Sequence, residues 1–245
     1  MLSGFYTAGS GILNQQRAVN VIGNNISNNQ TAGYKAQRLV STTFEQNYLN
    51  RLENGVYTNI GQGDPAVITD VVDTISDESY LKETGNPYDL ALVGNGYFNI
   101  SGNLNTYLTR NGNFNVDNEG YLISEGIGRV QGRNGDLLVK GSDFSITPHG
   151  LVYDSDGRYI DRLLITAPTD DTQVTRLNNG FYTAGQTEEV NTTTVYQHQL
   201  EQSNVDMNDE YTKLIEAQRA LQACASALKT VDTMNGKTAM LSSIS

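Results

Sequence analysis

Hydrophobic residues recur every seven positions in the first 30 residues of the chain. The residues with this spacing are Phe5, Ile12, Val19 and Ile26. A second, shorter series consists of Ala8 and Ile22, which lie three positions after Phe5 and Val19. The pattern predicts a helix with one narrow apolar face, the kind that packs against another helix. Gly4, Gly9, Gly11 and Gly23 interrupt the segment, and each costs about 1 kcal/mol relative to Ala in a helix interior. We therefore expect this helix to need partners in order to fold.

The last 45 residues show the same period. Two series of apolar residues define the stripe: Leu200, Met207, Leu214, Leu221 and Leu228, then Ala217, Cys224 and Val231. Polar and charged residues fill the other positions, and residues 203–206 offer N-cap candidates before the run. Cys224 lies on the stripe, which favours a buried small hydrophobe over a reactive thiol. The chain thus has a predicted helix at each end, and we expect the two to pack together.

Residues 85–195 show a different pattern, in which short apolar or alternating runs are separated by turn residues. The runs at 89–93 and 97–100, with Gly94-Asn95-Gly96 between them, are an example. Turn residues about every ten positions predict an antiparallel β domain, and residues 94–96 are interpreted as a hairpin turn. Residues 41–84 are more polar and contain one predicted strand, at 66–72.

The predicted fold is therefore α+β. A discontinuous helical coiled-coil domain is expected at 1–40 and 200–245, a linker or transition segment at 41–84, and an all-β antiparallel middle domain at 85–199. Two interpretations of the terminal stripes stay open at this point. In the first, the two terminal helices form a two-helix stem within one molecule. In the second, they bind the helices of other molecules and become ordered on binding.

Composition and charge exclude several classes of protein. The chain has 38% hydrophobic residues, 24 Gly and a formal net charge of −11, which argues against a nucleic-acid-binding surface. A single Cys excludes an intramolecular disulfide and a Cys-based zinc site. With no run of 18 apolar residues, we expect no membrane insertion, and the Gly-interrupted first residues lack the pattern of a Sec signal peptide. The charge is uneven, because residues 1–44 contain no carboxylate and residues 64–89 are strongly acidic.

Candidate chemistry is sparse. Gly94-Asn95-Gly96 fails as a dinucleotide-binding turn because Asn99 replaces the required Gly and a strand pattern follows. His149 and His198 lie near no recognisable nucleophile motif. We therefore predict no catalytic, cofactor-binding or metal-binding residue, and no enzymatic activity. The alternative is an extracytoplasmic β domain that binds or hydrolyses cell-wall material, for which the two catalytic carboxylates would be distant along the chain.

A motif near the N-terminus resembles one known family. Residues 23–35 read Gly-Asn-Asn-Ile-Ser-Asn-Asn-Gln-Thr-Ala-Gly-Tyr-Lys. They resemble the N-N-[IL]-A-N-x-x-T-P-G-[YF]-K pattern of the flagellar basal-body rod, hook and hook-junction family. Ser27 replaces the usual Ala and Ala32 the usual Pro, so the turn after the helix relies on Gly33. The motif residues in this block are Asn24, Asn25, Asn28, Gly33 and Tyr34.

Two further blocks are similar to the same family. The middle block comprises residues 89–98, 107–114 and 120–122, and the C-terminal block begins at Leu200-Glu201-Gln202-Ser203-Asn204-Val205-Asp206 and continues with Glu210. Its motif residues are Ser203, Asn204, Val205, Gln218 and Arg219. About 110 residues of predicted β domain resemble the proximal or distal rod protein, and the pattern does not separate the two.

The resemblance implies a non-enzymatic structural subunit of the flagellar rod, without cofactors, that polymerises into a helical tube and transmits motor torque to the hook. Its implied partners are other copies of itself, other rod and hook subunits, and the flagellar type III apparatus that exports it without a cleaved signal peptide. Its implied location is the periplasm-spanning rod of the basal body. The residues expected at the assembly interface are Phe5, Ile12, Val19, Ile22, Ile26, Leu214, Leu221, Leu228 and Val231.

Overall fold

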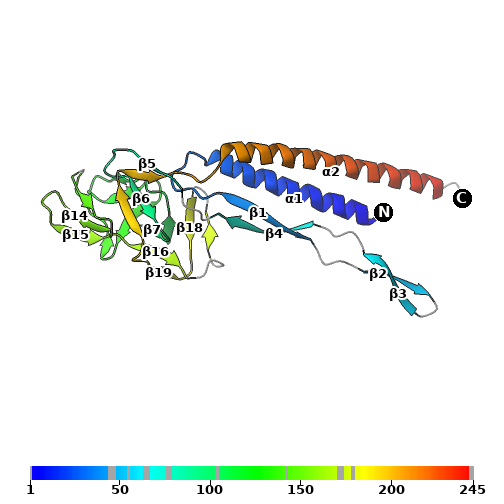
Figure 1. Ribbon diagram of the computed structural model, residues 1–245, viewed down its shortest axis with the longest axis horizontal. Coiled ribbons are helices and arrows are strands. Elements are labelled where there is room, and N and C mark those ends of the chain that lie inside the picture. The colour runs from blue at the N-terminus through cyan, green and yellow to red at the C-terminus, as the bar shows by residue number, and fades with distance from the viewer. Residues whose placement is uncertain are drawn as a thin grey trace. The chain divides into compact units, whose positions relative to one another are not determined.

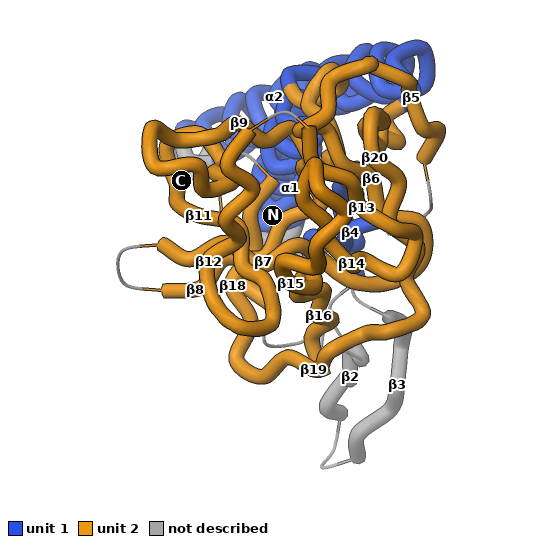
Figure 2. The backbone as a smooth tube through the Cα atoms, turned by 90° about the vertical axis from the view of Figure 1, so that its left-hand side faces the viewer, with its two compact units in different colours: residues 1–27, 37–75, 206–245 blue, residues 28–36, 76–205 orange. Residues whose placement is uncertain are grey.

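The chain forms two compact units in the computed structural model (Figures 1 and 2). Unit 1 comprises residues 1–27, 37–75 and 206–245, and unit 2 comprises residues 28–36 and 76–205. The structure describes residues 2–43, 48–53, 56–62, 67–75, 79–102, 105–141, 143–169, 174–177 and 180–242.

Two long helices, α1 (Leu2–Ser27) and α2 (Met207–Ser242), lie side by side in unit 1 (Figure 1). The α2 N-cap is Asp206, whose Oδ1 accepts hydrogen bonds from the amides of Asn208 (2.9 Å) and Asp209 (3.4 Å). The cap confirms the N-cap prediction at 203–206 and places Leu200, the first predicted stripe residue, outside the helix. Among the helical residues that the structure describes, no stretch is both long and apolar enough to cross a membrane.

Unit 1 also contains two antiparallel strand pairs. They are β1 (Gln37–Thr43) with β4 (Val67–Thr74), and β2 (Tyr48–Glu53) with β3 (Val56–Gln62). The strand predicted at 66–72 is observed as β4, with Ala66 outside the described residues. β1 runs beside α1, and the Ser41 hydroxyl donates a hydrogen bond to Asn14 Oδ1 (2.9 Å). The segment predicted as a linker at 41–84 therefore contributes strands to the helical unit.

Unit 2 consists of short strands joined by turns, as the sequence predicts. In chain order they are β5 (Leu81–Glu83), β6 (Leu90–Val93), β7 (Tyr97–Ser101), β8 (Thr106–Thr109), β9 (Asn115–Val116), β10 (Leu122–Ser124), β11 (Gly128–Gly132), β12 (Gly135–Asp136), β13 (Ser145–Ile146), β14 (Leu151–Tyr153), β15 (Tyr159–Arg162), β16 (Ile165–Pro168), β17 (Thr175–Arg176), β18 (Phe181–Thr183), β19 (Thr187–Glu189), β20 (Thr194–Gln197) and β21 (Gln199–Glu201). Among the described residues of unit 2, these strands pair in the antiparallel direction throughout.

The largest sheet of unit 2 has the central order β17-β18-β8-β7-β11-β10-β9, and β13-β14-β15, β20-β6 and β21-β5 form smaller sheets. The hairpin predicted around residues 94–96 is wrong, because β6 pairs with β20 and β7 pairs with β8. Residues 94–96 instead carry the chain from one sheet to another. Gly94 and Gly96 have φ values of 103° and 127°, which explains the Gly at both positions.

A single hydrophobic cluster forms the core of unit 2. Phe98 and Phe114 are fully buried and meet edge to face, with ring centroids 5.1 Å apart. Leu90, Leu92 and Ile100 pack in the same cluster. The observed α+β class matches the prediction, with two terminal helices and an antiparallel β middle region. The observed units also differ from the predicted boundaries because residues 28–36, 76–84 and 200–205 belong to the β unit.

Candidate assembly interface

The α1–α2 contact has small residues on one side and larger apolar residues on the other. A Cβ added at Gly4 would lie 3.9 Å from Val231 Cγ2, and one added at Gly11 would lie 3.1 Å from Cys224 Sγ. Asn25 continues this spacing of seven and contacts Glu210 of α2. Glycine at two of these positions lets the helices approach closely, since interhelical distance depends on the side chains at the contact.

The α2 stripe residues lie where the heptad pattern puts them. Leu214, Leu221, Leu228 and Val231 are half-buried between exposed neighbours, and Ala217 is buried. They form the side of α2 that faces α1, and Cys224 lies on this side as well.

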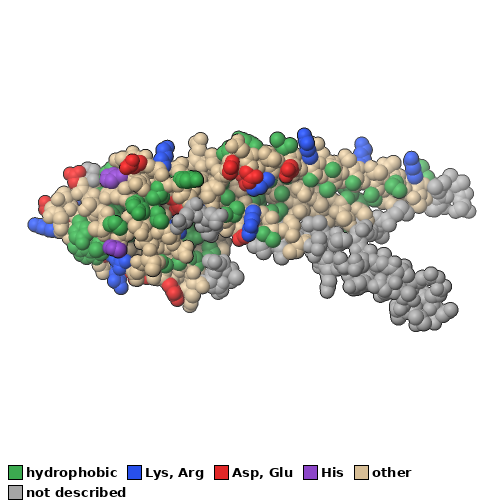
Figure 3. Space-filling model, viewed as in Figure 1, with side chains coloured by type: hydrophobic (Ala, Val, Ile, Leu, Met, Phe, Trp, Pro, Cys, Tyr) green, Lys and Arg blue, Asp and Glu red, His purple; other side chains and the backbone are tan. Residues whose placement is uncertain are grey.

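On α1, the residues of the predicted stripe each come one position after the residues that contact α2: Phe5 follows Gly4, Ile12 follows Gly11 and Ile26 follows Asn25. One position corresponds to a rotation of about 100° around a helix. Phe5 is 43% exposed, whereas Ile12, Val19 and Ile26 are half-buried and Ile22 is buried. These large residues therefore flank the seam between the helices. Figure 3 shows small groups of hydrophobic side chains along the helical pair, separated by polar surface, with Lys and Arg side chains spaced singly and Asp and Glu side chains gathered near the start of α2.

Asn25 is buried and ties α1 to both β1 and α2. Its side-chain amide donates to the Gln37 carbonyl (2.8 Å) and to Glu210 Oε2 (3.1 Å), and its Oδ1 accepts from the Gln37 amide (2.9 Å). Lys213 pairs with Asp209 (2.6 Å) and with Glu210 (3.4 Å). The hydrogen bond to Asp209 raises the pKa of Lys213, against the lowering effect of partial burial, and Glu210 raises it further. The Asn of the family motif thus has a defined bonding role within unit 1.

Six of the other motif residues lie in unit 2, which also contains a cluster of buried charges that we call the root cluster: Lys35, Arg110 and Glu201. Lys35 Nζ lies 2.5 Å from Glu201 Oε1, and Arg110 Nη1 lies 3.4 Å from Glu201 Oε2. All three side chains are at most 9% exposed. Arg110 also donates to the carbonyl oxygens of Leu92 and Gly94. The cluster joins the segment that follows α1 to the strand that precedes α2.

Backbone contacts beside the root cluster account for further motif residues. Gly33, with φ of 66°, donates its amide to the Glu201 carbonyl (2.8 Å), and a Cβ there would collide with the Arg110 carbonyl. Asn204 Oδ1 accepts from the Ala36 amide (2.6 Å). Gly33 is therefore required both for its backbone conformation and for this close approach.

The remaining motif residues lie in three environments. The guanidinium of Arg176 lies over the ring of Tyr34, with the Arg176 Cζ 4.4 Å from the ring centroid. Val205 is buried, and its amide donates to Ser203 Oγ (3.3 Å). Asn28 is half-buried, whereas Asn24, Gln218 and Arg219 are exposed. Sequence reasoning did not bring Lys35, Arg110 and Glu201 together; the available signal was that each is a charged residue inside a different motif block.

Tyr182, on β18, is a buried phenol near the root cluster. Its side chain is 3% exposed, and its hydroxyl has no hydrogen-bond partner within the described part of the chain. The ring lies 5.3 Å from that of Tyr97. Burial raises the pKa of Tyr182 to about 12, with Arg176 acting in the opposite direction.

Tyr182→Phe should stabilise unit 2 by about 1 kcal/mol, because it removes a buried hydroxyl that has no partner. In the wild-type chain, the pKa of Tyr182 is higher in the folded state than in the unfolded state, so ionisation of this tyrosine favours unfolding. The free energy of unfolding should therefore be at its full value below the unfolded pKa, near 10, and should fall as pH rises toward 12. The variant should lack this alkaline loss. Urea unfolding between pH 8 and 12 measures both effects, and Tyr159→Phe, at a 53% exposed position, is the control. A less stable Tyr182→Phe with an unchanged alkaline loss would contradict the assignment.

The two histidines that the sequence offers as candidate catalytic or metal-binding groups do not lie together. His149 and His198 are both exposed, and Figure 3 shows the two His side chains well separated on the surface. Within the residues that the structure covers, no group of His, Cys, Asp and Glu is placed to hold a metal ion.

Comparison with known proteins identifies the family. A model for the flagella basal body rod protein family matches residues 5–35, and a model for the C-terminal region of flagellar basal body rod FlgEFG proteins matches residues 196–241. The flagellar basal-body rod protein FlgG of Bacillus subtilis (strain 168) is 32% identical, over 95% of this chain and 96% of the relative. FlgF of Caulobacter vibrioides is 26% identical, over 86% and 85%. The flagellar hook protein FlgE of Treponema pallidum is 32% identical, over 54% of this chain and 30% of its own length.

The matched segments contain the residues described above. The N-terminal model spans most of α1 and the segment through Lys35, and the C-terminal model spans Glu201 and nearly all of α2. The similarity to FlgG extends through the β unit as well. The chain therefore belongs to the flagellar basal-body rod protein family and is a structural subunit of the flagellar rod or hook.

Proposed function

We propose that this subunit polymerises through α1 and α2 into the helical tube of the flagellar rod, which transmits motor torque to the hook. Its partners are further copies of the chain, neighbouring rod and hook subunits, and the flagellar type III apparatus that exports it. A contact between different surfaces of identical subunits generates an open helical filament when its rotation does not close. The two terminal helices supply such surfaces.

The observation that carries this proposal is the poor burial of the helical unit. Among the unit 1 side chains that the structure describes, the buried apolar residues are Val21, Ile22 and Ala217. Large apolar residues of α1 and α2 remain exposed instead: Phe5, Tyr6, Leu13, Tyr211, Ile215, Met234 and Met240. Two helices of 26 and 36 residues draw most of their stability from tertiary packing. Packing against neighbouring subunits would bury these residues and complete the fold of the unit.

The assembly residues expected from the sequence fit two roles in this proposal. Leu214, Leu221, Leu228 and Val231 hold α2 to α1 within a subunit. This role corresponds to the first of the two interpretations of the sequence, the two-helix stem within one molecule. Phe5, together with the half-buried large residues of α1, lies beside that seam and is available to a neighbour. The stem and the assembly surface are thus different faces of the same helical pair.

Unit 2 is the part of the subunit that would resist bending and twisting. Its core is a continuous cluster of fully buried side chains, and its root cluster fixes both segments that lead to the helices. Stiffness at this point is what torque transmission requires, because force passes between the helices and the β unit through residues 28–36 and 201–205.

The hydrolytic alternative predicts a pocket with two converging carboxylates in the β region. Among the described residues of unit 2, a pocket of about 390 Å³ lies at β10 and β11, and its lining contains the carboxylate of Asp136, 3.9 Å from Arg129. One carboxylate neighbouring an arginine does not supply an acid and a base for hydrolysis. No observation favours this alternative.

Sedimentation of the full-length chain beside Leu221→Asp tests the proposal. The wild-type chain should form polymers that pellet, and the variant should remain in the supernatant with unit 2 folded. A variant that polymerises normally would overturn the role of the terminal helices.

A further inference from the structure

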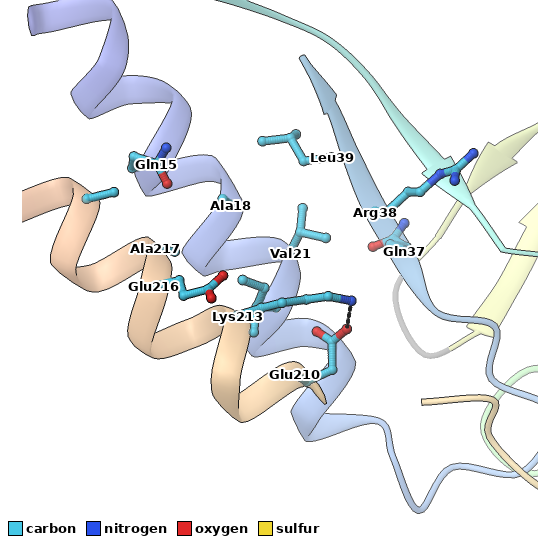
Figure 4. Close-up of a pocket in the computed structure, with 12 residues that line it drawn as sticks. Gln15, Ala18, Val21, Gln37, Arg38, Leu39, Glu210, Lys213, Glu216 and Ala217 are labelled. Carbon is cyan, nitrogen blue, oxygen red and sulfur yellow. Dashed lines mark hydrogen bonds and ion pairs between the residues drawn. The ribbon is translucent and has the colours of Figure 1, made fainter. Parts of the chain in front are cut away.

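Unit 1 contains a pocket of about 410 Å³ between α1, α2 and β1 (Figure 4). Apolar side chains supply half of its lining residues, namely Ala18, Val21, Ile22, Leu39, Ala217 and Ala220, and polar or charged side chains supply the other half, among them Glu210, Lys213 and Glu216 of α2. In Figure 4, Leu39 lies in the gap between β1 and the helices, and the Arg38 side chain points away from them. Arg38 pairs with Asp73 (2.8 Å) on the neighbouring strand. With apolar and polar lining residues in equal number, the pocket suits an uncharged group that has an apolar body and a polar tip, as a phenol ring has.

The size of the pocket limits what it can hold. At about 410 Å³ it lies near the lower end of the roughly 300–1,000 Å³ typical of ligand pockets. One or two side chains fit such a space, whereas a whole helix does not. An aromatic ring is well matched, because aromatic side chains contribute a large apolar area with few rotatable bonds.

An aromatic group of this kind is exposed on the same unit. Tyr6 of α1 is 67% exposed, and the ring of Phe5 meets its ring edge to face, with centroids 6.3 Å apart. Residues 1–16 contain no charged side chain, so burying this end of α1 costs no charge desolvation. Gly9, three residues after Tyr6 on the same side of α1, adds no side chain next to the ring.

Tyr6 cannot occupy the pocket of its own subunit. Nine residues separate it from Gln15, the first α1 residue of the lining, on one continuous helix, which corresponds to about 14 Å at 1.5 Å per residue. The projecting ring and the pocket are thus at different positions along the helical pair. If the ring of one copy enters the pocket of the next, every copy offers one ring and one pocket, and the contact extends without closing.

We propose that Tyr6 of one subunit, supported by Phe5, inserts into the α1–α2–β1 pocket of the next copy of this chain. This inference rests on the proposed polymerisation and names the contact through which it occurs. It makes Tyr6 the anchor of the interface, and Tyr6→Ala should weaken self-association about tenfold or more, as expected for the loss of a buried aromatic side chain.

Disulfide trapping between two variants tests the contact. In a full-length Cys224→Ser background, one variant carries Thr7→Cys, which places the thiol next to Tyr6 and keeps the Tyr6 ring, and the other carries Ala220→Cys at the pocket. The two are mixed, allowed to assemble and oxidised, and a covalent dimer should appear on a non-reducing gel. A disulfide requires Cα atoms within about 7 Å, so the readout is specific for insertion. Gln222→Cys, exposed and about 200° around α2 from Ala220, is the matched control and should give no dimer.

Each outcome decides a different claim. Circular dichroism first establishes that the variants keep the helical content of the Cys224→Ser chain, and sedimentation records their assembly. Polymers that pellet without the dimer, or with equal dimer yields at positions 220 and 222, would overturn the Tyr6 contact while polymerisation stands. A Cys224→Ser chain and a wild-type chain that both remain monomeric would overturn the proposed function, and this inference with it.

Discussion

Glu201→Gln should destabilise unit 2 by about 3–5 kcal/mol, the cost typical of breaking a buried ion pair by removing one partner. Glu201 is 3% exposed and faces the cations of Lys35 and Arg110. Gln keeps the shape of the side chain but removes the charge, so two buried cations lose their carboxylate. For a domain of this size, the loss corresponds to a fall in melting temperature of roughly 6–20 °C.

Thermal unfolding of the full chain measures this effect. The matched control is Asp73→Asn, which breaks the exposed pair with Arg38, where the side chains are 64% and 46% exposed. Exposed pairs contribute about 0–1 kcal/mol, so the control should melt within a few degrees of the wild-type chain. Equal small shifts for both variants would show that the root cluster does not stabilise the fold.

Leu221→Asp should abolish motility and filament formation while unit 2 remains folded. Leu221 is half-buried on the side of α2 that faces α1, and a carboxylate there meets apolar surface without a partner. The helical unit has little buried apolar area to offset this cost, whereas the core of unit 2 lies elsewhere in the sequence. The expected result is therefore a selective loss of assembly rather than general unfolding.

Complementation of a strain that lacks the chain, with swimming measured in soft agar, gives the functional readout. Gln222→Asp adds the same charge at the adjacent, exposed position of α2 and should swim normally. The melting transition of unit 2 should be the same in both variants. Normal swimming by Leu221→Asp, or equal loss in both variants, would contradict the account.

On α2, the heptad stripe and the contact with α1 coincide at Cys224 and Val231. On α1 the two differ: Gly4, Gly11 and Asn25 make the contact with α2, and Phe5 is exposed. A hydrophobicity pattern marks the largest apolar side chains, whereas close helix packing uses the smallest residues. For this reason the stripe predicted on α1 is displaced by one residue from the positions that contact α2.

In the β unit, turn residues locate the strands but do not select their partners. β6 pairs with β20, about 100 residues away, rather than with β7 across the Gly94–Gly96 turn. The same limit applies to the root cluster, because Lys35, Arg110 and Glu201 come from three distant segments. Their motif blocks are recognisable one at a time, and only the folded chain shows that they meet.

Hydrogen exchange of the same chain, free and assembled, tests the central claim most directly. In the dilute monomer, the amides of residues 2–27 and 207–242 should exchange quickly, because few of their apolar side chains are buried. In the polymer they should become strongly protected, while the core of unit 2 should be protected in both states. Terminal helices that are already fully protected in the dilute monomer, and unchanged on assembly, would contradict the claim that neighbouring subunits complete their fold.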